Sequence, residues 1–121
     1  DLIARRRALA DGYRARLAGL PGVTPPPEPM GLRSNWQSYC VRLPDDADQQ
    51  AVMQAMLDRG IATRRGIMCA HLEPPYAEAP RRFALPESER ARDHAILLPL
   101  YAAMTEAEQD QVVDALRDAL R

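Results

Sequence analysis

Apolar residues recur at helical spacing over the first twenty positions of the chain. Leu9, Tyr13, Leu17 and Leu20 lie three or four residues apart, which places them on one face of an amphipathic helix predicted for residues 2–20. Arginines occupy most of the other faces. This pattern predicts a helix that buries one side and exposes the other.

A proline-rich stretch follows this helix. Pro21-Gly22 ends the helix, and residues 25–29 include four prolines, which exclude both a helix and a central strand. We expect an extended connector rather than a domain boundary, because the preceding helix still needs a surface to cover.

Residues 36–43 alternate between apolar and polar side chains, which is typical of a half-buried strand. One face would carry Tyr39, Val41 and Leu43, and the other Ser38, Cys40 and Arg42.

A second helix is predicted between Pro44 and Gly60. The turn Pro44-Asp45-Asp46 can cap its start, and Gly60 provides its C-terminal stop. Its predicted buried stripe consists of Val52, Met53, Met56 and Leu57. A short strand is expected at residues 61–64.

Residues 66–86 lack sustained periodicity and contain four prolines. We interpret them as a long ordered loop with about one helical turn, and loops of this length inside compact domains are often functional. A short helix is expected at residues 87–95, followed by a buried strand at residues 96–98 that Pro99 closes.

The last helix has a complete start signal. In Thr105-Glu106-Ala107-Glu108 the threonine hydroxyl can accept from the third amide while the second glutamate reaches back, which is a capping box. The helix that follows would bury Val112, Val113, Leu116 and Leu120.

Together these elements predict an α/β fold of the α+β sandwich type, in which helices pack on a small mixed sheet in two layers. The 121 residues suffice for one domain, 1–121, since domains commonly have roughly 100 to 150 residues. The chain begins at Asp1, inside a predicted helix and without an initiator methionine, so we expect it to be part of a longer protein.

Composition narrows the functional classes. The net charge is -1 and the two signs are interleaved, so nucleic acid and anionic membrane are not expected partners. No long apolar run or signal-peptide pattern occurs, and we expect a cytoplasmic protein. Cys40 and Cys69 lack the spacing of a zinc site and are interpreted as free thiols.

The chain contains no lysine, because all 16 of its basic residues are arginines. A Schiff base to a cofactor aldehyde therefore cannot form on a lysine of this chain. No nucleophile with a base, metal cluster or phosphate loop is evident either, which disfavours a complete small enzyme.

Several local strings occur in a characteristic order over nearly the whole chain. They are residues 34–39 (Ser-Asn-Trp-Gln-Ser-Tyr), residues 60–64 (Gly-Ile-Ala-Thr-Arg), Ala70-His71 with Pro75-Tyr76, Leu85-Pro86 before Ser88-Glu89, residues 96–100 (Ile-Leu-Leu-Pro-Leu), and Met104-Thr105. In order and spacing the chain resembles the C-terminal small domain of the DegT/DnrJ/EryC1/StrS aminotransferases.

The resemblance implies a fold-type I enzyme, dependent on pyridoxal phosphate, that moves an amino group, usually from glutamate, onto a nucleotide-linked keto-sugar in amino-sugar or polysaccharide biosynthesis. Such enzymes are homodimers whose N-terminal large domain carries the Schiff-base lysine and most cofactor ligands. This chain would then hold no cofactor, metal or catalytic residue of its own, would be inactive alone, and would close the active-site mouth of the parent enzyme.

The resemblance also implies candidate substrate-binding residues near the start of the first strand. Gln37 matches a position that faces the sugar and is often histidine in the family, although an exposed strand-end glutamine is the alternative. Trp36 either stacks on a sugar or packs in the core.

Further candidates lie beyond the second helix. Arg64 or Arg65 could pair with a nucleotide diphosphate or a glutamate carboxylate, and strand alternation allows at most one of them to do so. His71 contacts a substrate phosphate or pins the loop, and Tyr76 packs or binds. His94 is expected to be an ordinary helix-end residue.

One departure from the family concerns residues 66–69 (Gly-Ile-Met-Cys), where the family frequently has aromatic residues. It leaves the identity of the substrate open. A function of another class, a stand-alone binding module that retains the small-domain fold without catalysis, is the alternative hypothesis.

Overall fold

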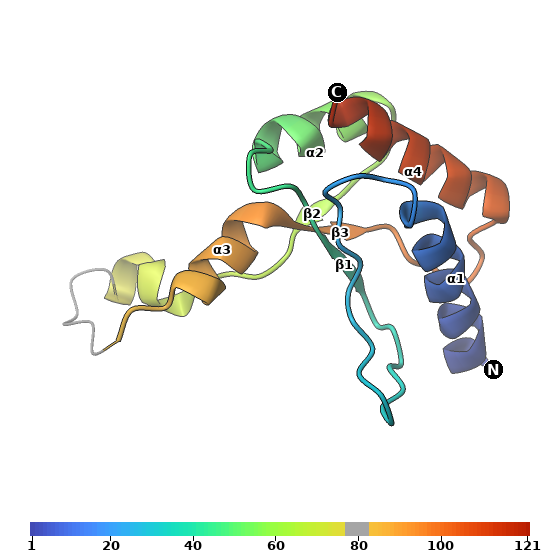
Figure 1. Cartoon of the computed structure of the whole chain (residues 1–121), viewed down its shortest axis with the longest axis horizontal. Helices are drawn as coiled ribbons and strands as arrows, with labels where there is room; N and C mark the ends of the chain where they lie inside the picture. The colour runs from blue at the N-terminus through green and yellow to red at the C-terminus, as the bar shows by residue number, and fades with distance from the viewer. Residues whose placement is uncertain (77–82) are drawn as a thin grey trace.

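The computed structural model describes residues 1–76 and 83–121 of the chain as four α-helices and three short strands (Figure 1). In chain order these are α1 (Leu2–Leu17), β1 (Tyr39–Arg42), α2 (Gln49–Asp58), β2 (Arg64–Arg65), α3 (Pro86–His94), β3 (Ala95–Leu98) and α4 (Glu106–Ala119). Two short 3-10 helices, Ala70–Leu72 and Pro74–Tyr76, lie between β2 and α3.

The strands form one sheet in the order β1-β3-β2. Tyr39 lies opposite Leu98 in the β1–β3 pair, and Arg64 lies opposite Leu97 in the β2–β3 pair. Both pairings are antiparallel, so the predicted α/β sandwich is confirmed but its sheet is not mixed. The physical reason is that β1 and β2 run in the same direction and the oppositely directed β3 separates them.

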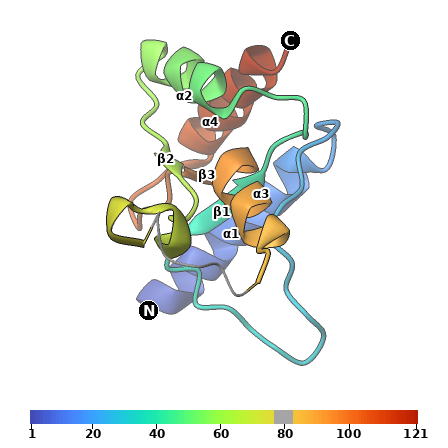
Figure 2. The same ribbon diagram turned by 90° about the vertical axis from the view of Figure 1, so that its left-hand side faces the viewer.

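Helices α1 and α2 each pack against α4, and the three helices share one core with one face of the sheet (Figures 1 and 2). The sheet contributes Tyr39, Val41, Ile96 and Leu98 to this core. These residues sit at alternate positions of β1 and β3, as the period of two requires for a sheet with one covered face. Leu43 is buried as well, which confirms the alternation predicted for the first strand.

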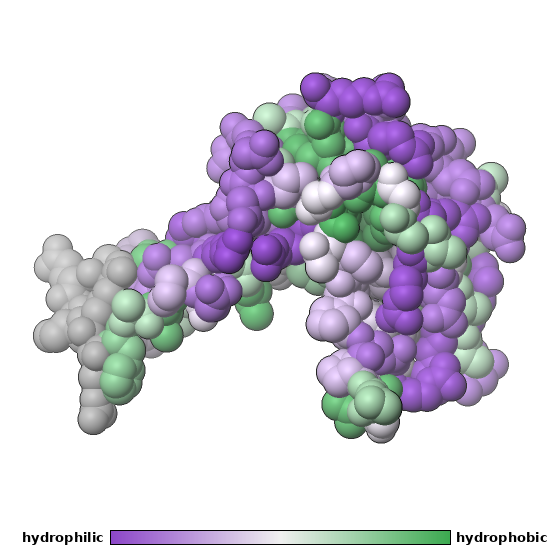
Figure 3. All heavy atoms as spheres, in the orientation of Figure 1, coloured by the Kyte–Doolittle hydropathy of each residue, from purple (hydrophilic) through white to green (hydrophobic). Residues whose placement is uncertain are grey.

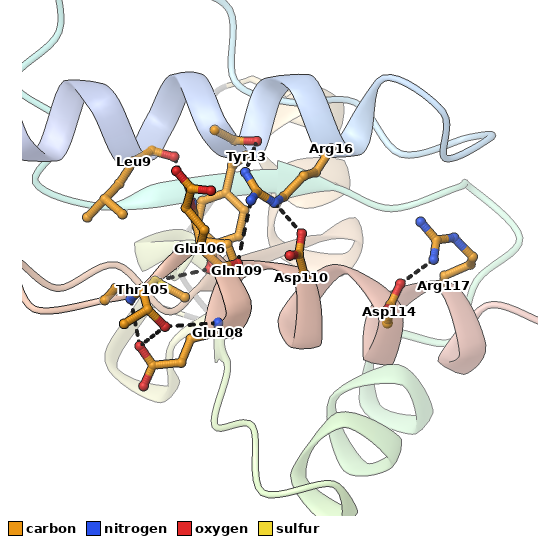
Figure 4. Close-up of polar contacts among 12 residues, drawn as sticks. Leu9, Tyr13, Arg16, Thr105, Glu106, Glu108, Gln109, Asp110, Asp114 and Arg117 are labelled. Atoms are coloured by element: carbon orange, nitrogen blue, oxygen red, sulfur yellow. Dashed lines mark hydrogen bonds and ion pairs between the residues drawn. The ribbon is translucent and has the colours of Figure 1, made fainter.

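Polar contacts fix α1 against α4 (Figure 4). The amide of buried Gln109 donates to the Leu9 carbonyl at 2.8 Å, and the Arg16 guanidinium pairs with Asp110 at 2.6 Å. The Tyr13 hydroxyl donates to the carbonyl of Pro99 at 2.7 Å, which ties α1 to the segment after β3. The first helix therefore belongs to the same packed unit as the last one.

The first helix and the first strand are both shorter than predicted. Helix α1 ends at Leu17 rather than at residue 20, because Gly19 and Pro21-Gly22 follow directly, yet Leu20 still reaches the core. Strand β1 begins at Tyr39 rather than at Trp36, since the backbone of Trp36 has a φ of 48°, which no strand residue adopts.

Helix α2 differs from its prediction in its N-cap and in its buried residues. Asp48 is its N-cap, in place of the predicted Asp45 or Asp46, and its carboxylate accepts from two backbone amides of the first turn. Leu57, predicted to be buried, is 54% exposed. Gln49, which was not predicted to be buried, is only 8% exposed. Its burial is possible because its side-chain amide donates to the carbonyls of Arg92 and Ala95 at 2.8 and 2.7 Å.

Between β2 and β3, the described residues 66–76 and 83–94, which include α3, extend away from α1, α2 and α4 as an arm (Figure 1). Strand β2 occupies residues 64–65 rather than the predicted 61–64. The expected loop contains two 3-10 helices among its described residues, and positions 77–82 of that expected loop lie outside the described residues. Helix α3, predicted for residues 87–95, spans Pro86–His94 and runs directly into β3.

Candidate functional site

The sheet has a second face, opposite the helices, that carries a row of three side chains. The strand register aligns Cys40, Leu97 and Arg64 across β1, β3 and β2. Cys40 and Leu97 are half-buried, and Arg64 is exposed. Burial raises the pKa of the Cys40 thiol, so this face presents a neutral thiol, an aliphatic side chain and one cation.

Arg65 lies on the other side of its strand. Its register partner is Ile96, which belongs to the helix-covered face. The side chain borders a hollow of about 340 Å³ next to Met53 and Leu57 of α2, and a second hollow of about 420 Å³ next to Met68. The two neighbouring arginines therefore serve different surfaces, as strand alternation predicts.

Neither Arg64 nor Arg65 makes a side-chain hydrogen bond or an ion pair with any residue that the structure describes. Most other arginines are paired, for example Arg59 with Asp118 at 2.6 Å. After Arg92 and His94, the charge of Arg65 also contributes to lowering the pKa of Asp93. The exposed guanidinium of Arg64 keeps all its donors for an external anion, and its planar fork matches a carboxylate or a phosphate.

The turn before β1 holds the next two candidates. Trp36 is 5% exposed, and its ring lies 5.5 Å from the ring of Tyr39 between centroids. The Arg14 guanidinium carbon is 5.9 Å from the Trp36 ring. Of the two alternatives for Trp36, this burial matches packing in the core. Gln37 is exposed, and its backbone amide donates to the side chain of Asn35 at 3.3 Å.

His71 and Tyr76 lie on the arm. His71 Nε2 is 2.9 Å from Glu89 Oε1, so this side chain connects the first 3-10 helix to α3. That contact matches the structural alternative for His71. Tyr76 ends the second 3-10 helix with 58% of its surface exposed. His94 is the last residue of α3 and is half-buried.

The six candidates thus occupy several places rather than one, with Arg65 beside α2 and on the opposite side of the sheet from Arg64. Gln37 and Arg64 lie on β1 and β2 or just before them, with β3 in between, which separates them by roughly 10 Å across the sheet. Trp36 lies in the core, and His71 and Tyr76 lie on the arm. A ligand that touches both Gln37 and Arg64 must be at least as long as this separation.

The sequence analysis did not predict the residues that shape the turn before β1 and the open face of the sheet. Ser34 and Asn35 accept from the amides of Trp36 and Gln37, two residues further on in each case. Serine and asparagine favour such turns, so the dipeptide itself is a signal that could have been used. The contribution of Cys40 and Leu97 depends on the register of a three-stranded sheet, which local pattern does not reveal.

The chain offers no attachment for an aldehyde cofactor, because it contains no lysine. Within residues 1–76 and 83–121, no three His, Cys, Asp or Glu side chains lie close enough together to hold a metal ion. None of the helices described is both long and apolar enough to cross a membrane. The groups present can bind and orient an anionic or hydroxylated ligand.

Comparison with known proteins gives the class of protein. The model of the DegT/DnrJ/EryC1/StrS aminotransferase family matches residues 1–117. The chain therefore belongs to this family, as the sequence resemblance predicts.

Three solved structures share the fold of the chain. The aminotransferase TlmJ from Streptoalloteichus hindustanus is 29% identical with a TM-score of 0.84, and the match covers 98% of this chain and 31% of TlmJ. DesV of S. venezuelae, solved in complex with a ketimine intermediate, is 32% identical with a TM-score of 0.84, and the match covers 98% of this chain and 32% of DesV.

A third structure, that of DesI in the presence of its TDP-sugar product, is 30% identical with a TM-score of 0.85. The match covers 98% of this chain and 31% of DesI. The chain thus spans about a third of the length of these solved proteins.

Proposed function

We propose that the chain is the C-terminal small domain of a pyridoxal-phosphate-dependent aminotransferase that transfers an amino group from glutamate to a nucleotide-linked keto-sugar. The observation that carries this proposal is the family match over residues 1–117, together with the aminotransferase TlmJ and with DesV, which are 29 and 32% identical over 98% of the chain. DesI was solved with a TDP-sugar product, which supports the nucleotide-sugar class of substrate.

The proposal divides the chemistry between two parts of one protein. Because this chain has no lysine, we place covalent attachment of the cofactor in the N-terminal large domain of the parent enzyme. Pyridoxal phosphate supplies the electron sink for the carbanion chemistry when it is bound there. The part described here would bind and orient the substrate and exclude water, and it would be inactive alone.

Arg64 is the residue of this chain that we assign to the substrate's negative charge. It is exposed, has no partner among the described residues and lies on the sheet face that α1, α2 and α4 leave open. Arg65 borders α2 instead and serves as the matched control for its neighbour. Gln37 would bond to sugar hydroxyls, and Tyr76 would contribute an aromatic edge from the arm.

The proposal extends to the assembly. The parent enzyme would be a cytoplasmic homodimer, in which the large domain covers the open face of the sheet. Trp36 and His71 would act indirectly, Trp36 from the core and His71 by holding the first 3-10 helix to α3.

The test is an absorbance spectrum of the full-length gene product after addition of pyridoxal phosphate. We expect the band of the bound aldehyde form to appear and to disappear on addition of glutamate. Arg64→Ala should raise KM for the nucleotide sugar at least tenfold, the effect of losing a charge-assisted pair worth about 1.5–3 kcal/mol. Arg65→Ala should change KM less than twofold.

Failure of the band to form in the full-length protein would contradict the aminotransferase proposal. It would favour the alternative, a stand-alone binding module that keeps the small-domain fold without catalysis. Equal effects of the two arginine variants would refute only the assignment of Arg64.

A further inference from the structure

The backbone immediately before β1 contains a left-handed residue that is not glycine. Trp36 has a φ of 48°, and it is the one non-glycine residue with a positive φ in the described part of the chain. A large side chain disfavours this conformation because its Cβ crowds the backbone. Such a conformation persists only where its surroundings fix it, and these positions concentrate at functional sites.

Three sets of contacts hold the turn. The Trp36 ring is buried against Tyr39. The hydroxyl of Ser34 accepts from the backbone amide of Trp36 at 3.1 Å, and the side-chain oxygen of Asn35 accepts from the backbone amide of Gln37 at 3.3 Å. The main chain of Ser34 is itself fixed on both sides. Its amide donates to Glu28 at 2.7 Å, and its carbonyl accepts from Arg7 of α1 at 2.9 Å.

The turn reverses which side chains face inward. Tyr39, Val41 and Leu43 point into the core, so a strand continued backwards with a period of two would place Gln37 inward and Trp36 outward. The structure shows the opposite, with Trp36 buried and Gln37 exposed. The left-handed residue therefore breaks the alternation, so that Trp36 is buried while Gln37 and Ser38 are both exposed.

We propose that Asn35 and Trp36 are positioning residues that hold Gln37 outward, where its amide meets the sugar of the nucleotide-linked substrate. This inference rests on the proposed function, which gives Gln37 its substrate contact. Trp36 fixes the reversed turn from the core side. Asn35 fixes the outer side, because its side-chain oxygen accepts a hydrogen bond from the backbone N–H of Gln37.

The test uses steady-state and half-reaction kinetics of the full-length protein with glutamate and the nucleotide sugar. Asn35→Ala should raise KM for the nucleotide sugar roughly three- to tenfold, the range of one hydrogen bond, while the half-reaction with glutamate keeps its rate. Asn35→Asp still offers an acceptor and should restore KM. Asn35→Gln, whose longer side chain does not close the two-residue turn, should behave like Asn35→Ala.

Combining the variants shows whether Asn35 acts through Gln37. We expect Gln37→Ala to raise KM by itself and the double variant Asn35→Ala/Gln37→Ala to be no worse than Gln37→Ala, because nothing then remains to be positioned. Ser38→Ala, one residue further on and also exposed, is the matched control and should leave KM unchanged.

Three results would overturn the inference. They are multiplicative effects in the double variant, a normal KM for Asn35→Ala in a folded protein, and a normal KM for Gln37→Ala. Each can occur while the glutamate half-reaction proceeds normally, so it would leave the proposed function intact. Loss of the glutamate half-reaction in the unmodified full-length protein would instead refute the proposed function, and this inference with it.

Discussion

Two buried tyrosines at the centre of the core differ in what their hydroxyl groups meet. The rings of Tyr13 and Tyr39 lie 5.1 Å apart between centroids, and both are fully buried. The Tyr13 hydroxyl donates to the Pro99 carbonyl at 2.7 Å, whereas the Tyr39 hydroxyl has no partner among the described residues. Burial raises the pKa of Tyr39 to about 12, so its hydroxyl stays protonated at neutral pH.

This difference predicts unequal effects of removing the two hydroxyls. Tyr13→Phe leaves the Pro99 carbonyl without its donor and should lower the free energy of unfolding by about 1 kcal/mol. Tyr39→Phe removes a buried group that has no partner and should change it by less than about 0.5 kcal/mol, in either direction. Urea unfolding of the 121-residue chain measures both values. A loss in Tyr39→Phe as large as in Tyr13→Phe would mean that the Tyr39 hydroxyl has a partner, such as a buried water.

At Gly66, the absence of a side chain affects the stability of the fold. A Cβ added there would lie 3.0 Å from the Cβ of Ala95 and 3.1 Å from the Sγ of Cys40. Gly66→Ala should therefore destabilise the chain by about 1–3 kcal/mol, the usual effect of overpacking. Gly19→Ala is the matched control, because an added Cβ there meets nothing within 4 Å. Equal unfolding midpoints for the two variants would show that the sheet can shift to accommodate the extra methyl group.

Helix α4 has the strongest local start signal of any element. The Thr105 hydroxyl accepts from the Glu108 amide at 3.2 Å, and the Glu108 carboxylate accepts from the Thr105 amide at 2.7 Å, which confirms the predicted capping box. Thr105→Ala should lower the free energy of unfolding by about 1 kcal/mol. Thr105→Ser keeps the acceptor and should retain most of the stability in the same denaturant titration. A full loss in the serine variant would assign the effect to the threonine methyl group.

The same cap makes the stability depend on pH in acid. The backbone amide of Thr105, and then the hydroxyls of Tyr101 and Thr105, lower the pKa of Glu108 by donating to its carboxylate. A carboxyl whose pKa is lower in the folded state stabilises that state above its unfolded pKa of about 4.3, and this contribution is lost as the pH falls through the lower folded value. Glu108→Gln should therefore be less stable than the unmodified chain at pH 7. The difference should disappear towards pH 2, and a constant difference between pH 7 and pH 2 would contradict this assignment.

The elements show what local sequence determines and what it does not. Alternation in residues 39–43 and the capping box at Thr105 predicted their structures correctly, because each is fixed by residues within a few positions of one another. The predicted start of β1 was wrong, because the turn at Trp36 depends on burial of its ring against Tyr39 and on contacts that Arg7 and Glu28 make with Ser34. Leu57 was placed in the core because helical periodicity gives a face but not the extent to which neighbours cover it.

The candidate site was predictable only in part for the same reason. Alternation indicated that Arg64 and Arg65 face opposite ways, and only the pairing with β3 shows that Arg64 shares a face with Leu97 and Cys40. The contact of His71 with Glu89 joins residues 18 positions apart, one on the first 3-10 helix and one on α3. Contacts of this kind depend on tertiary structure, which one sequence does not specify locally.

At the scale of the whole molecule, two projections carry apolar side chains away from the core. Figure 3 shows hydrophobic surface at the end of the loop before β1 and along the arm. Met30 and Leu32 are exposed in the loop, and Ile67, Met68, Phe83 and Leu85 are exposed on the arm. Met30 follows Pro29 in a turn that the Leu32 amide closes by donating to the Pro29 carbonyl at 3.0 Å, so this end has a defined shape.

Exposed apolar surface of this kind predicts that the 121-residue chain associates with itself. Its mass by light scattering should rise with concentration, because pairing of two chains removes these side chains from water. Replacing Met30, Leu32, Ile67 and Met68 by serine should reduce the association, whereas serine at Leu2, an exposed leucine on α1, should not. The full-length protein should show no growth beyond its dimer, since we expect the proposed large domain to cover these two projections as well as the open face of the sheet. A clean monomer of the 121-residue chain at all concentrations would mean that neither projection is an interface between copies of this chain.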